Sequence, residues 1–329
     1  MEEKIEKELK WAVLGTGIIA NEMAQALEKM GKNLYAVANR TYGKAVEFAE
    51  KYGVQKVYDK IEDMFTDKET DIIYITTPHN THIKFMIEAL KNGKHVLCEK
   101  SITLNSEELE EAVKIAKEKD LILGEAMTIF NMPLYTELLE IVNSGKLGDV
   151  KMIQVNFGSY KEYDMNNRFF NRNLAGGALL DIGVYAISIT RLFMTSKPDN
   201  VLSQVKYAPT GVDEQVGVIM MNKEQQMSTI ALTLHSKQPK RVVIACEKAY
   251  IEITEYPRAN KAKIVYTETG EVEEITAGMT SNALQYELQN MEESVKTGIN
   301  KMKLEYTIDV MDIMTELRKE WGMTYPEEE

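Results

Sequence analysis

The chain has 329 residues, 44% of them hydrophobic and 27% charged, which is ordinary for a soluble protein with room for two packed domains. Acidic residues outnumber basic ones by 51 to 39, and the net charge of −12 argues against nucleic-acid or anionic-membrane partners. No apolar run approaches the roughly 20 residues that cross a bilayer, and the N-terminus, MEEKIEKELK, lacks the apolar core of a secretion signal. Two cysteines, Cys98 and Cys246, make no disulfide framework. We therefore expect a cytoplasmic protein.

The first 124 residues alternate short β-rich runs with amphipathic helical stretches. We expect strands at residues 11–15, 34–39, 72–76, 95–98 and 121–123. We expect helices at 19–30, 42–52, 82–92 and 106–119. Asn105 is expected to cap the last of these helices, with Glu108 three residues on completing a capping box. This alternation predicts a parallel sheet covered on both faces.

The pattern changes after about residue 124. A helix is expected at 132–143, a strand at 150–160, and a helix led by paired glycines that runs to residue 193. Residues 200–267 are mostly strand-like, and two helices, at 283–296 and 306–320, end the chain. Runs of strands predict a mainly antiparallel sheet with helices on one face. The fold class is therefore α/β with two domains, residues 1–124 and 125–329.

The run GTGIIA at residues 15–20 follows an expected strand and opens an expected helix. In this context the first glycine permits a tight turn, the second lets a pyrophosphate approach the backbone, and the helix N-terminus faces the phosphates. A purely structural turn is the alternative. The residues expected to hold a dinucleotide here are Gly15, Thr16, Gly17, Ile18 and Ile19.

The second strand ends at Asn39, Arg40 and Thr41, with no acid where an NAD-preferring site would hold the ribose 2′-hydroxyl. The planar donor fork of Arg40, with further donors on either side, suits a 2′-phosphate. An ordinary exposed arginine at a strand end is the alternative. The sequence favours NADP as cofactor over NAD.

The loop after the fourth strand should border the nicotinamide half of the cofactor, because ligands in such folds lie outside the carboxyl ends of the strands. His79 and His82 in this loop lack a third ligand at zinc spacing, so no metal is expected. His82 is also interpreted as a hydrogen-bonding residue at a helix start. The cofactor-binding residues expected from this loop and the next strand end are Thr76, Thr77, Pro78, Asn80, His82, Glu99 and Lys100.

The run AGGALLDIGVY at residues 175–185 sets Asp181 and Tyr185 four residues apart, on one face of a helix. A phenol and a carboxylate that face one cleft form a plausible proton-handling pair. A buried helix with an ordinary polar side is the alternative. Lys100, at the end of the fifth strand, could hold a substrate hydroxyl and lower the pKa of a nearby phenol, or be a surface lysine paired with Glu99.

Taken together, these motifs closely resemble the Gfo/Idh/MocA oxidoreductases, and within them the branch of dihydrodiol dehydrogenase and glucose–fructose oxidoreductase. The resemblance runs from about Trp11 to Pro326 and includes the TGVDE run at 210–214 and the WGMTYP run at 321–326. It implies a Rossmann domain, then an α/β domain whose open sheet forms a homodimer or homotetramer. It also implies hydride transfer between a nicotinamide and a polyol, sugar, diol or carbonyl substrate.

In that family a lysine and the last residue of an Asp-x-x-x-His/Tyr pair flank the reacting carbon. The resemblance therefore assigns catalysis to Lys100, Tyr185 and Asp181, with Asp181, Tyr185 and Arg168 toward the substrate. Whether Lys100 or Tyr185 is the formal acid/base stays open, and a salt bridge is an equal alternative for Arg168. The chain departs from the family at Ser101, where relatives have proline, and at residues 125–131, which lack the usual tryptophan and arginine. An inactive NAD(P)-responsive regulatory protein on the same fold is the alternative function.

Overall fold

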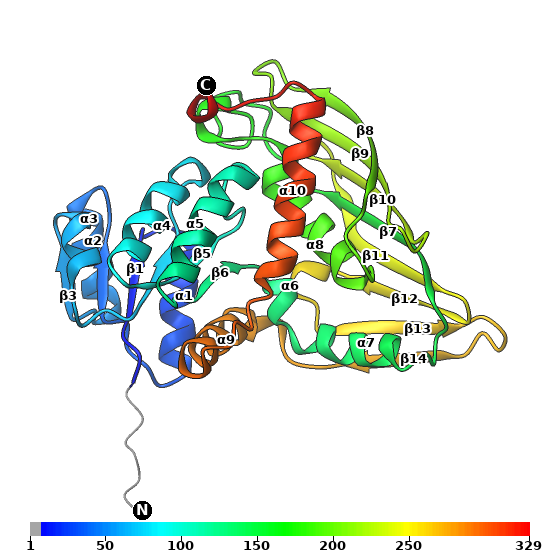
Figure 1. Cartoon of the computed structure of the whole chain (residues 1–329), viewed down its shortest axis with the longest axis horizontal. Helices are drawn as coiled ribbons and strands as arrows, with labels where there is room; N and C mark the ends of the chain where they lie inside the picture. Colours follow the sequence, from blue (N-terminus) through cyan, green and yellow to red (C-terminus); the bar gives the residue numbers. More distant parts are fainter. Residues whose placement is uncertain (1–7) are drawn as a thin grey trace, which may run out of the picture.

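The computed structural model describes residues 8–329, which form two β-sheets with helices packed on and between them (Figure 1). The smaller sheet lies at the left of Figure 1, the larger at the right, and the long helix α10 (Leu304–Glu320) lies between them. The predicted α/β fold class is confirmed. The expectation about a secretion signal rests largely on residues 1–7, which lie outside the described residues.

The smaller sheet has six strands in the order β3-β2-β1-β4-β5-β6, and every pairing in it is parallel. The central strands β1 and β4 are apolar and buried throughout, because helices cover both faces of the sheet. The strand order reverses at β1 and β4, and ligands of such sheets bind beyond the carboxyl ends of the strands at this point. The strands are β1 (Trp11–Leu14), β2 (Ala36–Ala38), β3 (Lys56–Tyr58), β4 (Ile72–Ile75), β5 (His95–Glu99) and β6 (Leu123–Ala126).

Alternate residues of β1 enter two different cores. Ala12 and Leu14 pack in the core that α4 and α5 cover, whereas Trp11 and Val13 pack in the core that α1, α2 and the later helix α9 (Ala283–Thr297) cover. Asn105 caps α5 as predicted, but the Glu108 carboxylate accepts from the Leu104 N–H rather than from the cap residue itself. The helices of this half are α1 (Ile18–Lys29), α2 (Tyr42–Tyr52), α3 (Ile61–Thr66), the 3₁₀ turn η1 (His79–Thr81), α4 (His82–Lys91) and α5 (Ser106–Glu118).

The larger sheet has eight strands in the order β14-β13-β12-β11-β7-β10-β9-β8. Only the β7–β10 pair is parallel, so the sheet is mainly antiparallel as expected. The strands are β7 (Val150–Gly158), β8 (Asn200–Tyr207), β9 (Asp213–Met221), β10 (Met227–Thr233), β11 (Gln238–Cys246), β12 (Ala249–Thr254), β13 (Lys261–Tyr266) and β14 (Val272–Thr276).

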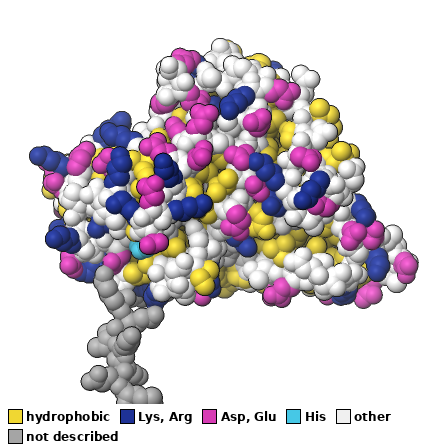
Figure 2. Space-filling view, in the orientation of Figure 1, with side chains coloured by type: hydrophobic (Ala, Val, Ile, Leu, Met, Phe, Trp, Pro, Cys, Tyr) yellow, Lys and Arg dark blue, Asp and Glu magenta, His cyan; other side chains and the backbone are white. Residues whose placement is uncertain are grey.

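Helices cover one face of this larger sheet and leave the other face open (Figure 1). Its alternating burial pattern is that of a sheet with one packed face. On the open face Leu202 is 62% exposed and Ile219, its partner across β8 and β9, is 46% exposed. Met152 and Met227 are also paired and exposed on this face. Figure 2 shows a different aspect of the surface, where acidic and basic side chains are interspersed.

The helices of the second half pack on both sheets. Helix α9 contacts α1, and α10 contacts α5 and α8, so the end of the chain returns to the first sheet. The indole of Trp11 in β1 donates to Glu292 of α9 at 3.0 Å. The elements are α6 (Thr128–Asn131), α7 (Pro133–Asn143), the π-helix η3 (Leu179–Gly183), α8 (Val184–Phe193), α9 (Ala283–Thr297) and α10, with the 3₁₀ turns η2 (Arg172–Leu174), η4 (Tyr256–Arg258), η5 (Thr280–Asn282) and η6 (Pro326–Glu328).

Several elements differ from the sequence-based expectation, among them the short helix α6 and the strand β14, which lie where none was expected. Strand β3 and helix α3 lie in a stretch where no element was expected, because β3 has only three residues and two of them are partly exposed. The strand expected at 121–123 is instead β6, Leu123–Ala126. The stretch Arg172–Phe193 is also more apolar than expected: by length and composition it could cross a membrane, yet 78% of its apolar 18-residue window is buried inside the fold, as in a core helix.

Candidate active site

The turn between β1 and α1 leaves the start of the helix open. Gly15 has φ +111°, and a Cβ there would lie 2.5 Å from Thr76 Oγ1, so only glycine fits without strain. A Cβ on Gly17, the N-cap of α1, would meet no atom within 4 Å. No side chain caps this helix, so its first backbone N–H groups face the open space beside Gly17. The arrangement is that of an anion-binding helix terminus.

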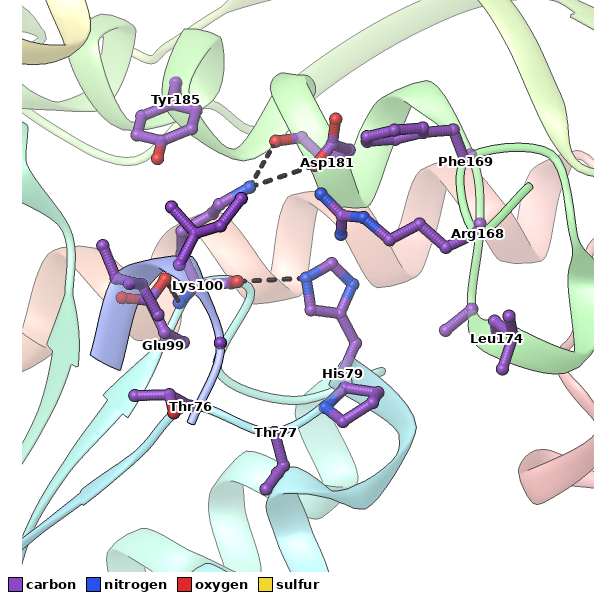
Figure 3. A pocket seen from close by; sticks show the side chains of 17 residues that line it. Thr76, Thr77, His79, Glu99, Lys100, Arg168, Phe169, Leu174, Asp181 and Tyr185 are labelled. Carbon is purple, nitrogen blue, oxygen red and sulfur yellow. Dashed lines mark hydrogen bonds and ion pairs between the residues drawn. The ribbon is translucent and has the colours of Figure 1, made fainter. Parts of the chain in front are cut away.

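A cavity of about 540 Å³ extends from this turn to the π-helix η3. It lies at the carboxyl ends of the parallel strands, between the two halves of the chain. Figure 3 shows side chains from both halves pointing into it. The lining residues are Gly17, Ile18, Ile19, Thr76, Thr77, Pro78, His79, Glu99, Lys100, Arg168, Phe169, Leu174, Ala175, Gly176, Gly177, Asp181 and Tyr185.

Lys100, directly after β5, crosses the cavity to the second half of the chain (Figure 3). Its ammonium donates to the backbone carbonyl of Asp181 at 2.7 Å and to the Asp181 carboxylate at 3.2 Å. The same Nζ lies 5.0 Å from the centre of the Tyr185 ring. The structure therefore brings the lysine, the carboxylate and the phenol into one site.

Asp181 lies in the π-helical turn η3 and Tyr185 in the first turn of α8, which follows it directly, where the sequence suggested one regular α-helix. The carbonyls of this turn accept hydrogen bonds from the lysine loop: Ser101 Oγ donates to Leu180 O at 2.9 Å, and Lys100 Nζ donates to Asp181 O. The Lys100–Ser101 peptide bond is cis. π-Helical turns are frequent at functional sites because they break the regular α-helical spacing of side chains.

The N-terminal end of this helical segment is anchored by residues that the sequence analysis did not assign to the site. Asp213 Oδ2 accepts from the Leu179 backbone N–H at 2.6 Å. Gly177, with φ +126°, makes room for this carboxylate, since a Cβ there would lie 2.1 Å from Asp213 Oδ1. Tyr325 donates to Gly176 O at 2.7 Å. The only sequence signal was that Asp213 and Tyr325 belong to the TGVDE and WGMTYP runs.

Burial and local charge set the protonation states of the site. Burial raises the pKa of Tyr185 to about 12, although nearby Lys100 works against this rise. Burial alone would lower the pKa of Lys100, but Asp181, Tyr185 and Glu99 outweigh it and the pKa is raised. Burial would raise the pKa of Asp181, but Lys100 and Arg168 hold it below its usual value. At neutral pH the site therefore holds an ammonium, a carboxylate and a neutral phenol.

The two histidines of the loop after β4 hold the lysine loop in place. His79 lines the cavity, and its Nε2 donates to Lys100 O at 3.0 Å. Burial, followed by the charge of Lys100, lowers the pKa of His79 to about 3, so its ring is neutral. His82, at the start of α4, is fully buried, with ring nitrogens 3.0 Å from Ser101 O and 2.7 Å from Thr77 O. The sequence alone suggested no role for His79 other than that of a possible metal ligand.

Glu99 precedes the lysine and lines the cavity. The Tyr74 hydroxyl donates to its Oε1, and the Lys100 backbone N–H donates to its Oε2 at 3.3 Å. Burial raises the pKa of Glu99, and the hydrogen bond from Tyr74 partly offsets this rise. Glu99 is thus held by backbone and phenol, whereas the ammonium of Lys100 pairs with Asp181, not with Glu99.

The residues expected to bind a cofactor divide into two groups. Asn80 lies on η1 but its amide donates to Glu327 near the C-terminus at 2.5 Å, and the Thr77 hydroxyl accepts from Thr81 at 2.8 Å. The expected residues in the cavity wall are Gly17, Ile18, Ile19, Thr76, Thr77, Pro78, Glu99 and Lys100. Those outside it are Gly15, Thr16, Asn39, Arg40, Thr41, Asn80 and His82.

The end of β2 carries the residues expected to choose between NADP and NAD. Asn39 Nδ2 donates to Thr41 O at 3.0 Å and so orders this turn. Arg40 is exposed, and it makes no ion pair with any of residues 8–329. Its guanidinium is thus free to bind a ligand beyond β2.

Arg168, expected near the substrate, lines the cavity on the loop between β7 and η2. Its guanidinium carbon lies 4.2 Å from the centre of the Phe169 ring and points toward Asp181 and His79 (Figure 3). The salt bridge considered as an alternative is absent among residues 8–329. Within the same range, no group of three or more His, Cys, Asp or Glu side chains could hold a metal ion.

Comparisons with known proteins identify the family. Residues 9–127 match the model of the oxidoreductase family with an NAD-binding Rossmann fold, GFO_IDH_MocA, and residues 135–252 match the GFO/IDH/MocA C-terminal domain. A trans-1,2-dihydrobenzene-1,2-diol dehydrogenase from Xenopus laevis is 30% identical over 96% of this chain and 99% of its own. The Homo sapiens protein of that name is 27% identical over 97% and 99%.

Solved structures share the fold at lower identity. A 3-ketoreductase from Actinomadura kijaniata, in complex with NADP and TDP-benzene, superposes with a TM-score of 0.85 at 18% identity, covering 95% of this chain and 98% of that one. Levoglucosan dehydrogenase, in complex with NADH and L-sorbose, gives 0.85 at 16% identity, covering 95% and 96%. The chain therefore belongs to the Gfo/Idh/MocA family and is an NAD(P)-dependent oxidoreductase that acts on CH–OH groups.

Proposed function

We propose that the protein interconverts a hydroxyl and a carbonyl group on a sugar-like polyol or diol, with NADP(H) as its cofactor. One observation carries this proposal: Lys100 from the first half and Tyr185 from the second share one cavity with the Gly17 turn. The Tyr185 hydroxyl has no hydrogen-bond partner within the described part of the chain, so it is available to a substrate oxygen. An ammonium and a free phenol beside a dinucleotide turn suit hydride-transfer chemistry on an alcohol.

The residues present fit a nicotinamide dinucleotide. A Cβ on Gly17 would fill the cradle beside the uncapped start of α1, where a pyrophosphate would accept from the N–H groups of Ile18 and Ile19. Thr76, Thr77 and Pro78 would lie along the nicotinamide half. When bound, the nicotinamide supplies the hydride acceptor or donor for the reacting carbon.

The protein side chains handle the proton and the developing charge. Because burial raises the pKa of Tyr185 to about 12, the phenol is protonated at neutral pH and can donate to a carbonyl oxygen during reduction. Oxidation is the reverse step and starts from the phenolate form of Tyr185, which the nearby Lys100 ammonium favours; the phenolate takes the hydroxyl proton of the substrate and becomes the neutral phenol. Lys100 stabilises the alkoxide that develops, and Asp181 holds Lys100 in position through two hydrogen bonds.

Arg40 supports NADP rather than NAD as the preferred cofactor. It is exposed at the end of β2, where a ribose 2′-phosphate would lie, and no acidic residue follows the strand. Guanidinium groups bind phosphate through two parallel hydrogen bonds. The ketoreductase complex contains NADP, whereas the levoglucosan dehydrogenase complex contains NADH.

The open face of the larger sheet supports a homodimer, or a homotetramer built from it. Its exposed apolar side chains follow one face of neighbouring strands, and such a surface is typical of a protein–protein contact. A second copy of the chain could cover it by an isologous contact. A cytoplasmic location and a boundary between two domains near residue 124 complete the proposal.

The experiment is a screen of NADPH oxidation, at saturating cofactor, against aldoses, ketoses, inosones and dicarbonyls. We expect turnover of at least one polyhydroxylated carbonyl compound, and its loss in Lys100→Met and Tyr185→Phe. Binding of NADPH without turnover across the whole panel would contradict the proposal and favour the alternative of an NAD(P)-responsive regulatory protein.

A further inference from the structure

Two cationic side chains flank the ring of Phe169. Arg168 and Phe169 line the substrate end of the cavity, whereas Lys161 contacts the same ring but is not itself among the lining residues. The Lys161 ammonium lies 4.1 Å from the centre of the Phe169 ring, and the Arg168 guanidinium carbon lies 4.2 Å from it. Both residues belong to the segment that follows β7. The Lys161 backbone N–H donates to the carbonyl of Leu234, the residue directly after β10, at 2.7 Å. The ring orients both cations through cation–π contacts.

Neither cation is neutralised by the protein. Within residues 8–329, no carboxylate lies within ion-pair distance of Arg168 or Lys161. Arg172, four residues further along the same segment, is different, because it binds Glu329 and Thr324. The charge of the Asp181 carboxylate is felt by both cations, but this carboxylate is already paired with Lys100.

Positive charge therefore accumulates at this end of the cavity. Burial lowers the pKa of Lys161, and Arg168, Lys100 and Lys237 lower it further, while Asp181 partly offsets them. Lys161 is partly buried and Arg168 is exposed. Like-charge crowding at a partly buried lysine is unfavourable unless an anion relieves it. In a chain with a net charge of −12, an unpaired cationic cluster of this kind is unlike the interspersed charges on the face that Figure 2 shows.

The cavity also has room for a charged substituent. It continues past Asp181 to Arg168, Phe169 and Leu174, which lie on the opposite side of Asp181 from Tyr185 (Figure 3). A substrate whose reacting oxygen lies at Tyr185 and Lys100 would therefore extend its remaining carbons toward Arg168.

We propose that Arg168 and Lys161, oriented by Phe169, form a subsite for an anionic group of the substrate, so that the substrate is a sugar or polyol carrying a phosphate or a carboxylate. The inference rests on the proposed function only for the reaction at Tyr185 and Lys100, at the other end of the bound substrate. Arg168 supplies a bidentate fork and Lys161 a point charge, a combination that suits both kinds of anion. Arg168 and Lys161 thereby become specificity residues for the reaction.

The first test measures anion binding without turnover. Inorganic phosphate is titrated by isothermal calorimetry into the protein saturated with NADP, which occupies the pyrophosphate turn at Gly17. We expect Arg168→Met and Lys161→Met each to weaken phosphate binding by about 10- to 100-fold. Lys84→Met is the matched control, since Lys84 also lies over an aromatic ring, at 5.6 Å from the centre of Phe85, but belongs to α4 and does not contact Phe169. Equal phosphate affinity in all four proteins would overturn the inference.

The second test compares substrates that differ only in charge: D-glucose, D-glucose 6-phosphate and D-glucuronate, with their keto counterparts in the reducing direction. We expect kcat/KM to be about 10- to 100-fold higher for at least one of the two anionic sugars than for D-glucose. This advantage should shrink with added salt, and in Arg168→Met the anionic sugar should fall to the kcat/KM of D-glucose. A higher KM for NADPH in Arg168→Met, with substrate KM unchanged, would assign the cations to the cofactor and overturn the inference. Phosphate binding that depends on Arg168, without turnover of any sugar, would refute the proposed function alone.

Discussion

Gly17 and Gly15 lie two residues apart in the same turn, yet alanine should affect a different property at each: cofactor binding at Gly17 and stability of the fold at Gly15. At Gly17 the backbone has φ −75°, which suits any residue, and the added Cβ would meet no atom within 4 Å. Replacing a glycine N-cap with alanine costs at most about 1 kcal/mol of stability. The methyl group would, however, occupy the place where a pyrophosphate approaches the backbone. We expect the dissociation constant for NADPH to rise at least about tenfold, equivalent to about 1.4 kcal/mol.

At Gly15 the fold itself should suffer. The residue has φ +111°, and the added Cβ would lie 2.5 Å from Thr76 Oγ1 and 3.1 Å from its carbonyl oxygen. Holding a non-glycine residue in such a conformation costs about 1–3 kcal/mol, so Gly15→Ala should lower the melting temperature by several degrees. Fluorescence titration with NADPH and thermal denaturation separate the two effects.

Gly217→Ala on β9 is the control, because its Cβ would also meet no atom within 4 Å and it lies far from the cavity. It should leave NADPH binding unchanged. A Gly17→Ala protein that binds NADPH as tightly as the wild type, with an unchanged melting temperature, would refute the assignment of the pyrophosphate to this turn.

Three further predictions concern the cofactor, the fold and the assembly. Arg40→Ala should weaken NADPH binding by about 10- to 100-fold and leave NADH binding unchanged; equal weakening of both in titrations would exclude a 2′-phosphate contact. Burial raises the pKa of Asp213 to about 7, so its contribution to stability is complete below its unfolded pKa of about 4 and is lost as the pH rises toward and through about 7. As the pH rises from about 5 to 8, the free energy of unfolding of Asp213→Asn should therefore fall less than that of the wild type, the difference being up to about 1.4 kcal/mol per pH unit. Melting temperatures of the two proteins measured across this pH range check this, and parallel curves of melting temperature against pH would contradict it. Leu202→Glu, on the open sheet face, should give monomers in size-exclusion chromatography with light scattering, and an unchanged mass would place the interface elsewhere.

Much of the fold could be predicted because its signals are local. Alternating strands and amphipathic helices in the first half predict a parallel sheet, and the period-2 pattern of residues 200–267 predicts the antiparallel one. Element ends were less certain: β5 runs to Glu99 and β6 begins at Leu123. Strand β3 was not predicted because three residues at a sheet edge are too few to show a periodic pattern of apolar side chains.

The site is a mixed case. The spacing of Asp181 and Tyr185 and the position of Lys100 at a strand end suggested that these groups face one cavity, and the structure places them there. The supporting contacts join residues that are far apart in sequence: His79 to Lys100, and Asp213 to Leu179. No local pattern encodes such a pairing, since it follows from how the two halves pack.

Packing between distant parts of the chain also explains why two residues that were expected to bind the cofactor, Asn80 and His82, lie outside the cavity wall. Asn80 binds Glu327 of the C-terminal turn, a contact across nearly the whole chain. His82 is buried between two carbonyl oxygens and supports the loop from behind. Loop residues beside a strand end could be predicted to lie near the cofactor, but the direction of each side chain depends on distant partners.

The central claim is that the Tyr185 phenol and the Lys100 ammonium act on one substrate oxygen. The most direct measurement is the single-turnover rate of NADPH oxidation by Tyr185→Phe with a carbonyl substrate, compared with Tyr160→Phe, whose side chain is 63% exposed and outside the cavity. The account predicts a rate about 10²–10⁴ times lower for Tyr185→Phe, with NADPH affinity unchanged, and a wild-type rate for Tyr160→Phe. A wild-type rate in Tyr185→Phe would contradict it.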